Sequence, residues 1–417
     1  MLHRSHLLAA AAVSLLAFPA AAQETTLTVT ATPSIFKPMF ERFVSEFEAA
    51  NPDIDVELTV PPGEQREMIQ DILRRALVND LPDVTFQGYN FISVLADRDL
   101  PVALDGLIAS DPDWTDETFS PSVAAAATFR EQVLGLGVGI SFPVLYYNAD
   151  LVRQAQGGEA AFPETWEGVV ELAVDVGALS DDVIGGFHRF HPWIFQAQIE
   201  SRGGRLMNSE ETEITFDGQE GTQTFALYRA FAEAGQGAFA MTREQARQAF
   251  ASGTVGILTD SSSVLKNYQD QIGDAFEIGI ARFPIVEGGS IPAAGVASVM
   301  LTEDETQQAA AWRFMKFVSG PQGQVIVAEE TAYVPANTVV VDDPDYLADY
   351  YAERPLMRAA LQTLPYASAW YSFPGENSVK IGDVIYDRVQ SVLTLETEPG
   401  EGLELLVSEV QDLLPQR

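Results

Sequence analysis

Alternating patterns of apolar residues near the start of the chain limit the fold more than any other feature of the sequence. Residues 27–30 and 54–60 alternate apolar and polar side chains, which is typical of half-buried strands. Phenylalanines recur at helical spacing over residues 36–47, and a second amphipathic helix is expected over 69–76. A short strand over 84–86 follows. The order strand–helix–strand–helix–strand predicts an α/β fold with a largely parallel sheet and right-handed crossovers.

The loops that follow these three strands are polar and rich in turn residues. They cover residues 32–34, 61–66 and 88–90. Ligands of open α/β sheets bind outside the carboxyl ends of the strands, so these loops are candidates for a binding site. Ordinary connections between strands and helices have the same composition, and this alternative stays open.

Length, charge and the absence of cysteine exclude several classes of function. The 417 residues are enough for two or three domains of ~100–200 residues each. With 24 basic and 60 acidic residues, the formal net charge of −36 would repel the phosphate backbones of nucleic acids and anionic lipids. A chain without cysteine has no thiol nucleophile, disulfide or zinc-thiolate site. We therefore expect no nucleic-acid partner.

Residues 1–22 have the pattern of a secretory signal peptide. Arg4 precedes an apolar stretch over 7–18, and Ala20 and Ala22 form an A-x-A cleavage site before Gln23. The apolar stretch is shorter than the ~20 residues needed to span a bilayer, and no cysteine follows it for lipid attachment. The pattern predicts export with cleavage and a location in the periplasm.

No catalytic motif stands out. Of the four histidines, only His188 and His191 would remain after cleavage, and Gly185, Gly186 and Pro192 disfavour the helix that could align them on a metal. The Gly-x-Ser-x-Gly and Gly-x-x-x-x-Gly-Lys motifs are absent from the sequence. We predict no catalytic residue, metal or cofactor. Sixty acidic residues nevertheless leave a glycan hydrolase with two carboxylates open as an alternative.

Aromatic side chains beside polar turn residues suggest a different chemistry. Trp193 and Trp370 lie in such contexts, whereas Trp166 and Trp312 are expected in the core. Aromatic faces stack on the apolar faces of sugar rings, while hydroxyl and amide groups bind the sugar hydroxyls. Farther along the chain, Thr242 and Thr302 are each followed three residues later by Gln or Glu and are expected to cap helices.

Four segments resemble the extracytoplasmic solute-binding proteins of ABC importers, in the sugar-binding subgroup that includes maltose- and glycerol-3-phosphate-binding proteins. They are residues 142–151, 162–169, 249–257 and 312–318. The resemblance implies a type II two-lobe fold whose lobes are discontinuous in sequence and joined by crossing strands. Lobe 1 would comprise residues 23–139 and 291–325, and lobe 2 residues 140–290 and 326–417. A monomer would close on a sugar-like ligand and deliver it to the membrane permease.

The resemblance also assigns the cleft positions of the family to residues of this chain. They are Arg66, Tyr89, Asn90, Ser141, Trp193, Ser261, Ser262, Gly295, Tyr333 and Trp370. Glycerol-phosphate binders carry an arginine where residues 370–379 of this chain have none, and Glu376 lies there instead. A neutral sugar, polyol or glycoside is therefore favoured. Arg66 leaves glycerol 3-phosphate or a glycerophosphodiester open as the alternative ligand.

Overall fold

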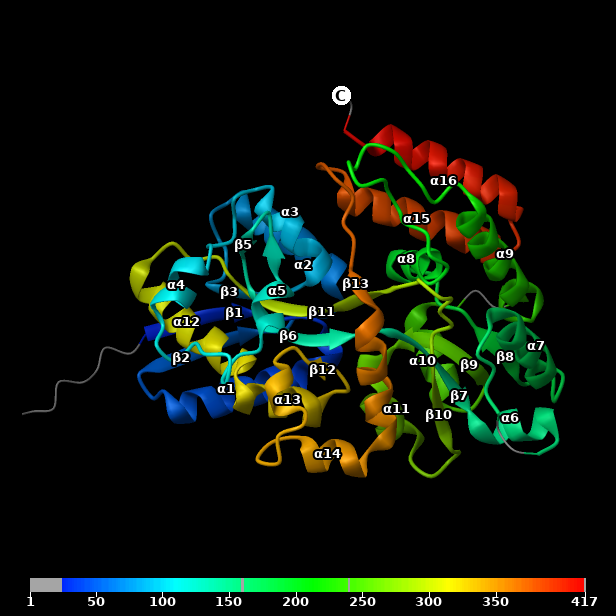
Figure 1. The fold of residues 1–417 in the computed structure, drawn as a ribbon, viewed down its shortest axis with the longest axis horizontal. Helices are drawn as coiled ribbons and strands as arrows, with labels where there is room; N and C mark the ends of the chain where they lie inside the picture. Colours follow the sequence, from blue (N-terminus) through cyan, green and yellow to red (C-terminus); the bar gives the residue numbers. More distant parts are fainter. Residues whose placement is uncertain (1–24, 159–160, 239–240, 416–417) are drawn as a thin grey trace, which may run out of the picture.

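Two β-sheets organise the computed structural model, which describes residues 25–158, 161–238 and 241–415 (Figure 1). The predicted signal peptide, residues 1–22, lies outside these ranges. The larger sheet has the strand order β12-β6-β11-β3-β1-β2, with β13 beside β11, and the smaller has the order β10-β7-β9-β8. The strands of the larger sheet are β1 (Thr25–Thr30), β2 (Ile54–Thr59), β3 (Val84–Gly88), β6 (Leu136–Ser141), β11 (Ile291–Met300), β12 (Val334–Pro335) and β13 (Ala367–Ala369). Those of the smaller are β7 (Pro143–Asn148), β8 (Ile184–Phe187), β9 (Val255–Ser261) and β10 (Ile278–Arg282), and a short hairpin joins β4 (Thr128–Phe129) to β5 (Gln132–Val133).

The strand–helix alternation predicted at the start of the chain is confirmed. Strand β1 pairs in parallel with β2 and with β3. The expectation of a largely parallel sheet is wrong for the other half, because β11 is antiparallel to both β3 and β6, and β12 is antiparallel to β6. The sheet is mixed because β11 returns from the smaller sheet and runs antiparallel to β3 and β6, although it is parallel to β13.

Helices cover both faces of the larger sheet, and the sequence of β11 shows how (Figure 1). Val296 and Met300 face the core that contains the phenylalanines of α1, whereas Ala297 and Val299 face α2 and α3, as expected for side chains that alternate along a strand. The helices of this lobe are α1 (Lys37–Ala50), α2 (Gln65–Ala76), α3 (Ile92–Ala96), α4 (Asp105–Ser110), α5 (Pro121–Ala125), α12 (Glu305–Ser319) and α13 (Pro321–Glu330). We call the larger sheet with these helices lobe 1.

The smaller sheet and its helices form lobe 2, onto which the C-terminal helices pack. Helices α15 and α16 contact each other and α9, and α15 also contacts α8. The helices are α6 (Ala149–Gln156), α7 (Trp166–Gly177), α8 (Pro192–Glu200), α9 (Gln219–Glu233), α10 (Arg243–Ala251), α11 (Leu265–Ile272), α15 (Ser378–Leu393) and α16 (Pro399–Leu413), while α14 (Ala348–Glu353) lies beside residues 355–359. In the part of the chain that the structure describes, none of the helices is long and apolar enough to cross a membrane.

Two strands carry the chain between the lobes. Strand β6 continues through Phe142 into β7, so one extended segment belongs to both sheets. Strand β11 returns the chain to lobe 1. The expected assignment of residues 326–335 to lobe 2 is wrong, because α13 packs on α1 and α12 and Val334 pairs with Ile140 in the larger sheet.

Helix caps illustrate which local signals determine the structure. The Thr242 hydroxyl accepts a hydrogen bond from the backbone N–H of Gln245, whose side chain bonds back to Thr242, so this predicted capping box is confirmed. The cap predicted at Thr302 is wrong, since Asp304 caps α12 by accepting from two backbone N–H groups. A carboxylate one residue before the helix is an equally good cap, and it also interacts favourably with the helix dipole.

Candidate ligand-binding cleft

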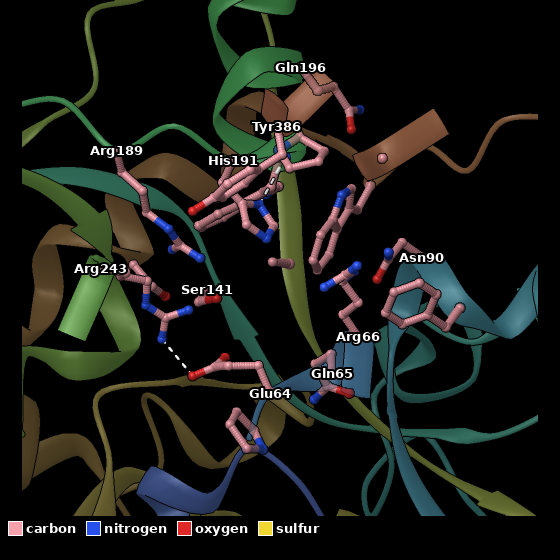
Figure 2. Close-up of a pocket in the computed structure, with 18 of the residues that line it drawn as sticks. Glu64, Gln65, Arg66, Asn90, Ser141, Arg189, His191, Gln196, Arg243 and Tyr386 are labelled. Carbon is pink, nitrogen blue, oxygen red and sulfur yellow. Dashed lines mark hydrogen bonds and ion pairs between the residues drawn. The ribbon is translucent and has the colours of Figure 1, made fainter. Parts of the chain in front are cut away.

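A cleft of about 680 Å³ lies between the lobes (Figure 2). Its lobe 1 wall includes Pro33 after β1, Glu64 and Gln65 at the start of α2, and Asn90 after β3. These residues come from the three loops that the sequence predicts at the carboxyl ends of the first three strands. The lobe 2 wall comes from the first turns of α8 and α10, from α15, and from Ser261, Ser263 and Val264 at the end of β9.

Eight of the ten residues predicted to bind ligand line this cleft: Arg66, Asn90, Ser141, Trp193, Ser261, Gly295, Tyr333 and Trp370. The other two lie behind its wall. The Tyr89 hydroxyl donates to the carbonyl oxygen of Gly139 at 2.9 Å, and the Ser262 Oγ accepts from the backbone N–H of Phe142 at 3.1 Å. Tyr89 and Ser262 therefore fasten the crossing segment β6–β7, and the structure does not place them at the ligand surface.

Gly295 is required by the close approach of two strands. Its φ is +155°, and a Cβ atom there would lie 1.9 Å from the carbonyl oxygen of Gly139. A side chain would therefore push β11 away from β6, at the place where both strands border the cleft. The main role of this glycine is to hold the crossing strands together beside the cleft.

The two candidate tryptophans differ in how much of the ring is available. Trp193 is 2% exposed, packs on Trp370 with 5.9 Å between ring centroids, and donates from Nε1 to the carbonyl oxygen of Pro292 at 2.9 Å. Trp370 is only partly buried, so it presents more of its surface to the cleft. Trp166 and Trp312 lie in the core as predicted.

The two histidines do not form a metal site. His188 is buried between Thr259, 2.8 Å from its Nδ1, and Gln198, 3.1 Å from its Nε2, and burial lowers its pKa to about 3. His191 accepts a hydrogen bond from the backbone N–H of Trp193 and so caps α8. In the described ranges, no group of three or more potential ligands is suited to holding a metal ion.

Arginines that the sequence did not single out lie at the inner end of the cleft. Arg189 and Arg247 both bind the carboxylate of Asp260, which is 1% exposed. Burial would raise the pKa of Asp260, but the charges of Arg247, Arg189 and Arg243 outweigh it and hold the pKa well below its usual range. Burial and repulsion by Arg243 lower the pKa of Arg189 to about 10. Arg189, Arg247 and Asp260 are therefore charged at neutral pH.

Two ion pairs cross the cleft. Arg243 at the start of α10 donates to Glu64 at 2.6 Å, drawn as a dashed line in Figure 2, and Arg66 in α2 binds Asp383 in α15 at 2.7 Å. Each pair joins lobe 1 to lobe 2. One signal for this cluster was present in the sequence, because Arg243 and Arg247 are spaced by one helical turn after the predicted cap at Thr242.

Comparison with known proteins identifies the fold and the family of this chain. A binding protein of Brucella abortus (strain 2308) is 24% identical over 418 residues, which cover 95% of this chain and 94% of that protein. Among solved structures, the GacH receptor of Streptomyces glaucescens, solved unliganded and with acarbose, matches with a TM-score of 0.79 at 20% identity over 94% of this chain and 98% of its own. UgpB from Mycobacterium tuberculosis, in complex with glycerophosphocholine, matches with a TM-score of 0.80 at 20% identity over 92% and 97%.

These similarities agree with the two lobes and the mixed α/β architecture described above. The family model for bacterial extracellular solute-binding proteins matches residues 42–355, which is most of the chain. This protein therefore belongs to the bacterial extracellular solute-binding proteins, a family of binding proteins and not of enzymes.

Proposed function

We propose that this protein is the periplasmic substrate-binding component of an ABC importer. It captures a sugar-like solute, such as a mono- or oligosaccharide, a polyol or a glycoside, in the cleft between the lobes. It then delivers the solute unaltered to the membrane permease, and it acts as a monomer. Membership of a non-enzymatic family removes the alternative of a glycan hydrolase.

The composition of the cleft wall carries this proposal. Trp370 and Tyr386 line the cleft with surfaces that are only partly buried, so their rings can stack on the apolar face of a sugar. Asn90 adds a side-chain amide to the cleft wall, and Ser141 adds a hydroxyl. Both kinds of group form hydrogen bonds with sugar hydroxyls.

Ligand binding is expected to favour the closed arrangement, because the ligand would contact both lobes at once. Asn90 lies on the lobe 1 side, whereas Trp370 lies beside α8 of lobe 2. A ligand shifts an equilibrium between open and closed forms only by the difference in its affinity for the two. A ligand with micromolar affinity supplies about 8 kcal/mol in total, which sets the upper limit of such a shift.

The similar proteins support this ligand class. The GacH receptor was solved with acarbose, and the Mycobacterium tuberculosis UgpB was solved with glycerophosphocholine. A glycerol 3-phosphate or glycerophosphodiester ligand is the second candidate, and the cationic Arg66 in the cleft wall favours it.

A thermal-shift screen against sugars, polyols and glycerol phosphates tests the proposal directly. We expect at least one compound to raise the melting temperature, to bind stoichiometrically in calorimetry and to be recovered chemically intact by mass spectrometry. X-ray scattering should show a more compact particle with that compound. A panel that leaves both the melting temperature and the scattering profile unchanged would contradict the proposal.

A further inference from the structure

Arg189 is a buried guanidinium whose hydrogen-bonding capacity is mostly unused. Its side chain is 8% exposed, and its Nη1 donates to Asp260 Oδ1 at 3.0 Å. A guanidinium carries five N–H donors, and the Nε of Arg189 is buried without a partner in the described residues. Burying a cation is costly unless it is paired and hydrogen-bonded. Most N–H donors of Arg189 therefore have no acceptor among the described residues.

The carboxylate of Asp260 cannot supply that acceptor, because it is already saturated. Its Oδ1 also accepts from Arg247 at 3.1 Å and from the backbone N–H of Ser261 at 2.8 Å. Its Oδ2 accepts from Arg247 at 2.6 Å and from the Tyr268 hydroxyl at 3.0 Å. A carboxylate offers about four lone-pair sites, so these bonds fill it. One negative charge is shared by two guanidinium groups, and one positive charge is left over.

Arg243 places a second under-used guanidinium in the same space. Its side chain is 19% exposed and one nitrogen donates to Glu64. Its buried Nε has no hydrogen-bond partner among the described residues, and the nearest carboxylate oxygen, from the exposed Glu244, lies 4.0 Å away. In Figure 2, Arg189 and Arg243 point toward the same opening, with Ser141 at its border. With Arg247, three guanidinium groups at the inner end face two carboxylates, those of Asp260 and Glu64.

Other acidic residues line the cleft, but they lie in contact with solvent. Glu67, Glu244 and Asp387 are all exposed, and Asp383, whose side chain is 38% exposed, is paired with Arg66. Salt screens exposed charges beyond about 8 Å at physiological ionic strength, whereas buried charges are screened much less. The inner end of the cleft is therefore positive, even though the whole chain carries a formal charge of −36.

We propose that the ligand carries one anionic group, a carboxylate or a phosphate, that binds between Arg189 and Arg243. The inference rests on the proposed function and narrows its ligand class to sugar acids or phosphorylated polyols. Guanidinium groups bind such oxyanions through paired, charge-assisted hydrogen bonds. The Trp193 ring, with its centroid 5.9 Å from the Arg189 Cζ, orients that guanidinium. The preference for a neutral ligand came from residues 370–379 alone, whereas these arginines come from other segments.

Calorimetry with matched neutral and charged probes tests the inference. One series is glucose, glucuronate and glucose 6-phosphate, and the other is glycerol, glycerate and glycerol 3-phosphate. In at least one series we expect a charged member to bind at least tenfold more tightly than the neutral one. The carboxylate and phosphate members then show which oxyanion the site accepts.

Two variants test whether the anion binds to Arg189 and Arg243. Arg243→Gln should reduce the affinity for the charged probe at least tenfold, and Arg189→Met should do the same if it folds. Arg74→Gln removes an equal charge from the exposed face of α2, where the side chain is 67% exposed, and should change nothing. Equal binding of neutral and charged members in both series would overturn this inference and leave the proposed function intact. Absence of binding by all six probes would also overturn this inference, whereas the proposed function would still be decided by the wider thermal-shift panel.

Discussion

Arg243 in lobe 2 donates a hydrogen bond to Glu64 in lobe 1, with 2.6 Å between Nη2 and Oε1. The pair between Arg66 and Asp383 crosses the same cleft in the opposite sense, because there the cation belongs to lobe 1. The lobe 1 partners, Glu64 and Arg66, lie two positions apart at the start of α2. Both pairs are therefore expected to act on the proposed closing of one lobe against the other.

Removing one cross-cleft pair should open the ligand-free protein. Exposed pairs contribute about 0.2–1 kcal/mol, so Asp383→Asn should lower the ratio of closed to open molecules between about 1.4-fold and 5-fold. Small-angle scattering should show a larger radius of gyration. Asp71→Asn removes a comparable pair within α2 itself and serves as the control. Identical scattering from Asp383→Asn and the control would mean that the pair does not hold the lobes.

Trp370 and Trp193 should separate ligand binding from stability. Because Trp370 is only partly buried, Trp370→Ala should weaken ligand binding at least tenfold with little loss of melting temperature. Trp193 is 2% exposed, so Trp193→Ala should cost about 3–5 kcal/mol of unfolding free energy. Calorimetric titration and urea denaturation measure the two effects. Unchanged ligand affinity in Trp370→Ala would mean that this ring does not contribute to ligand binding.

Asp260 should be among the most sensitive acidic positions for stability. Asp260→Asn leaves Arg189 and Arg247 buried beside a neutral group, and breaking a buried pair in this way costs about 3–5 kcal/mol. Asp270→Asn removes an exposed carboxylate that pairs with Lys266 and should cost less than about 1 kcal/mol. Urea denaturation compares them, and equal midpoints would show that the buried cluster is not a stabilising unit.

The buried histidines predict a specific pH dependence of stability. Burial, with a smaller contribution from Arg202, lowers the folded-state pKa of His188 to about 3, against 6.5 for the ordinary group, and burial also lowers the pKa of His191. The unfolded chain therefore binds more protons below pH 6.5, and this part of the stability, complete above 6.5, is lost as the pH falls toward 3. The slope is at most about 1.4 kcal/mol per pH unit for each group.

Urea unfolding between pH 7.5 and 4.5 measures this slope. Carboxylates with lowered pKa values, such as Asp260, contribute mainly below their ordinary value of 3.8, so they hardly affect this window. His188→Gln should reduce the slope. A flat profile in the native protein would contradict the buried, neutral state of both histidines.

Local sequence patterns predicted the lobe 1 loops and two tryptophans of the cleft but missed its buried arginines. The loops after β1, β2 and β3 were predictable because apolar periodicity identifies strands and because parallel strands present their ends at one edge. Arg189 and Asp260 are 71 positions apart, and in a chain with 60 acidic residues no spacing shows which carboxylate meets which arginine. Only the tertiary fold brings them together. For the same reason the membership of α13 in lobe 1 followed from packing and not from sequence order.

The position of β11 between β3 and β6 has a consequence for how the chain is made. Until residues 291–300 emerge during synthesis, β3 lacks one neighbour and β6 lacks its main partner. Strand β12 completes the sheet only at residues 334–335. Strand pairings between residues far apart in the sequence form slowly. The nascent chain therefore has strand edges with unpaired backbone N–H and C=O groups through most of its elongation. The larger sheet is therefore expected to complete its pairing only after about four fifths of the chain has been made.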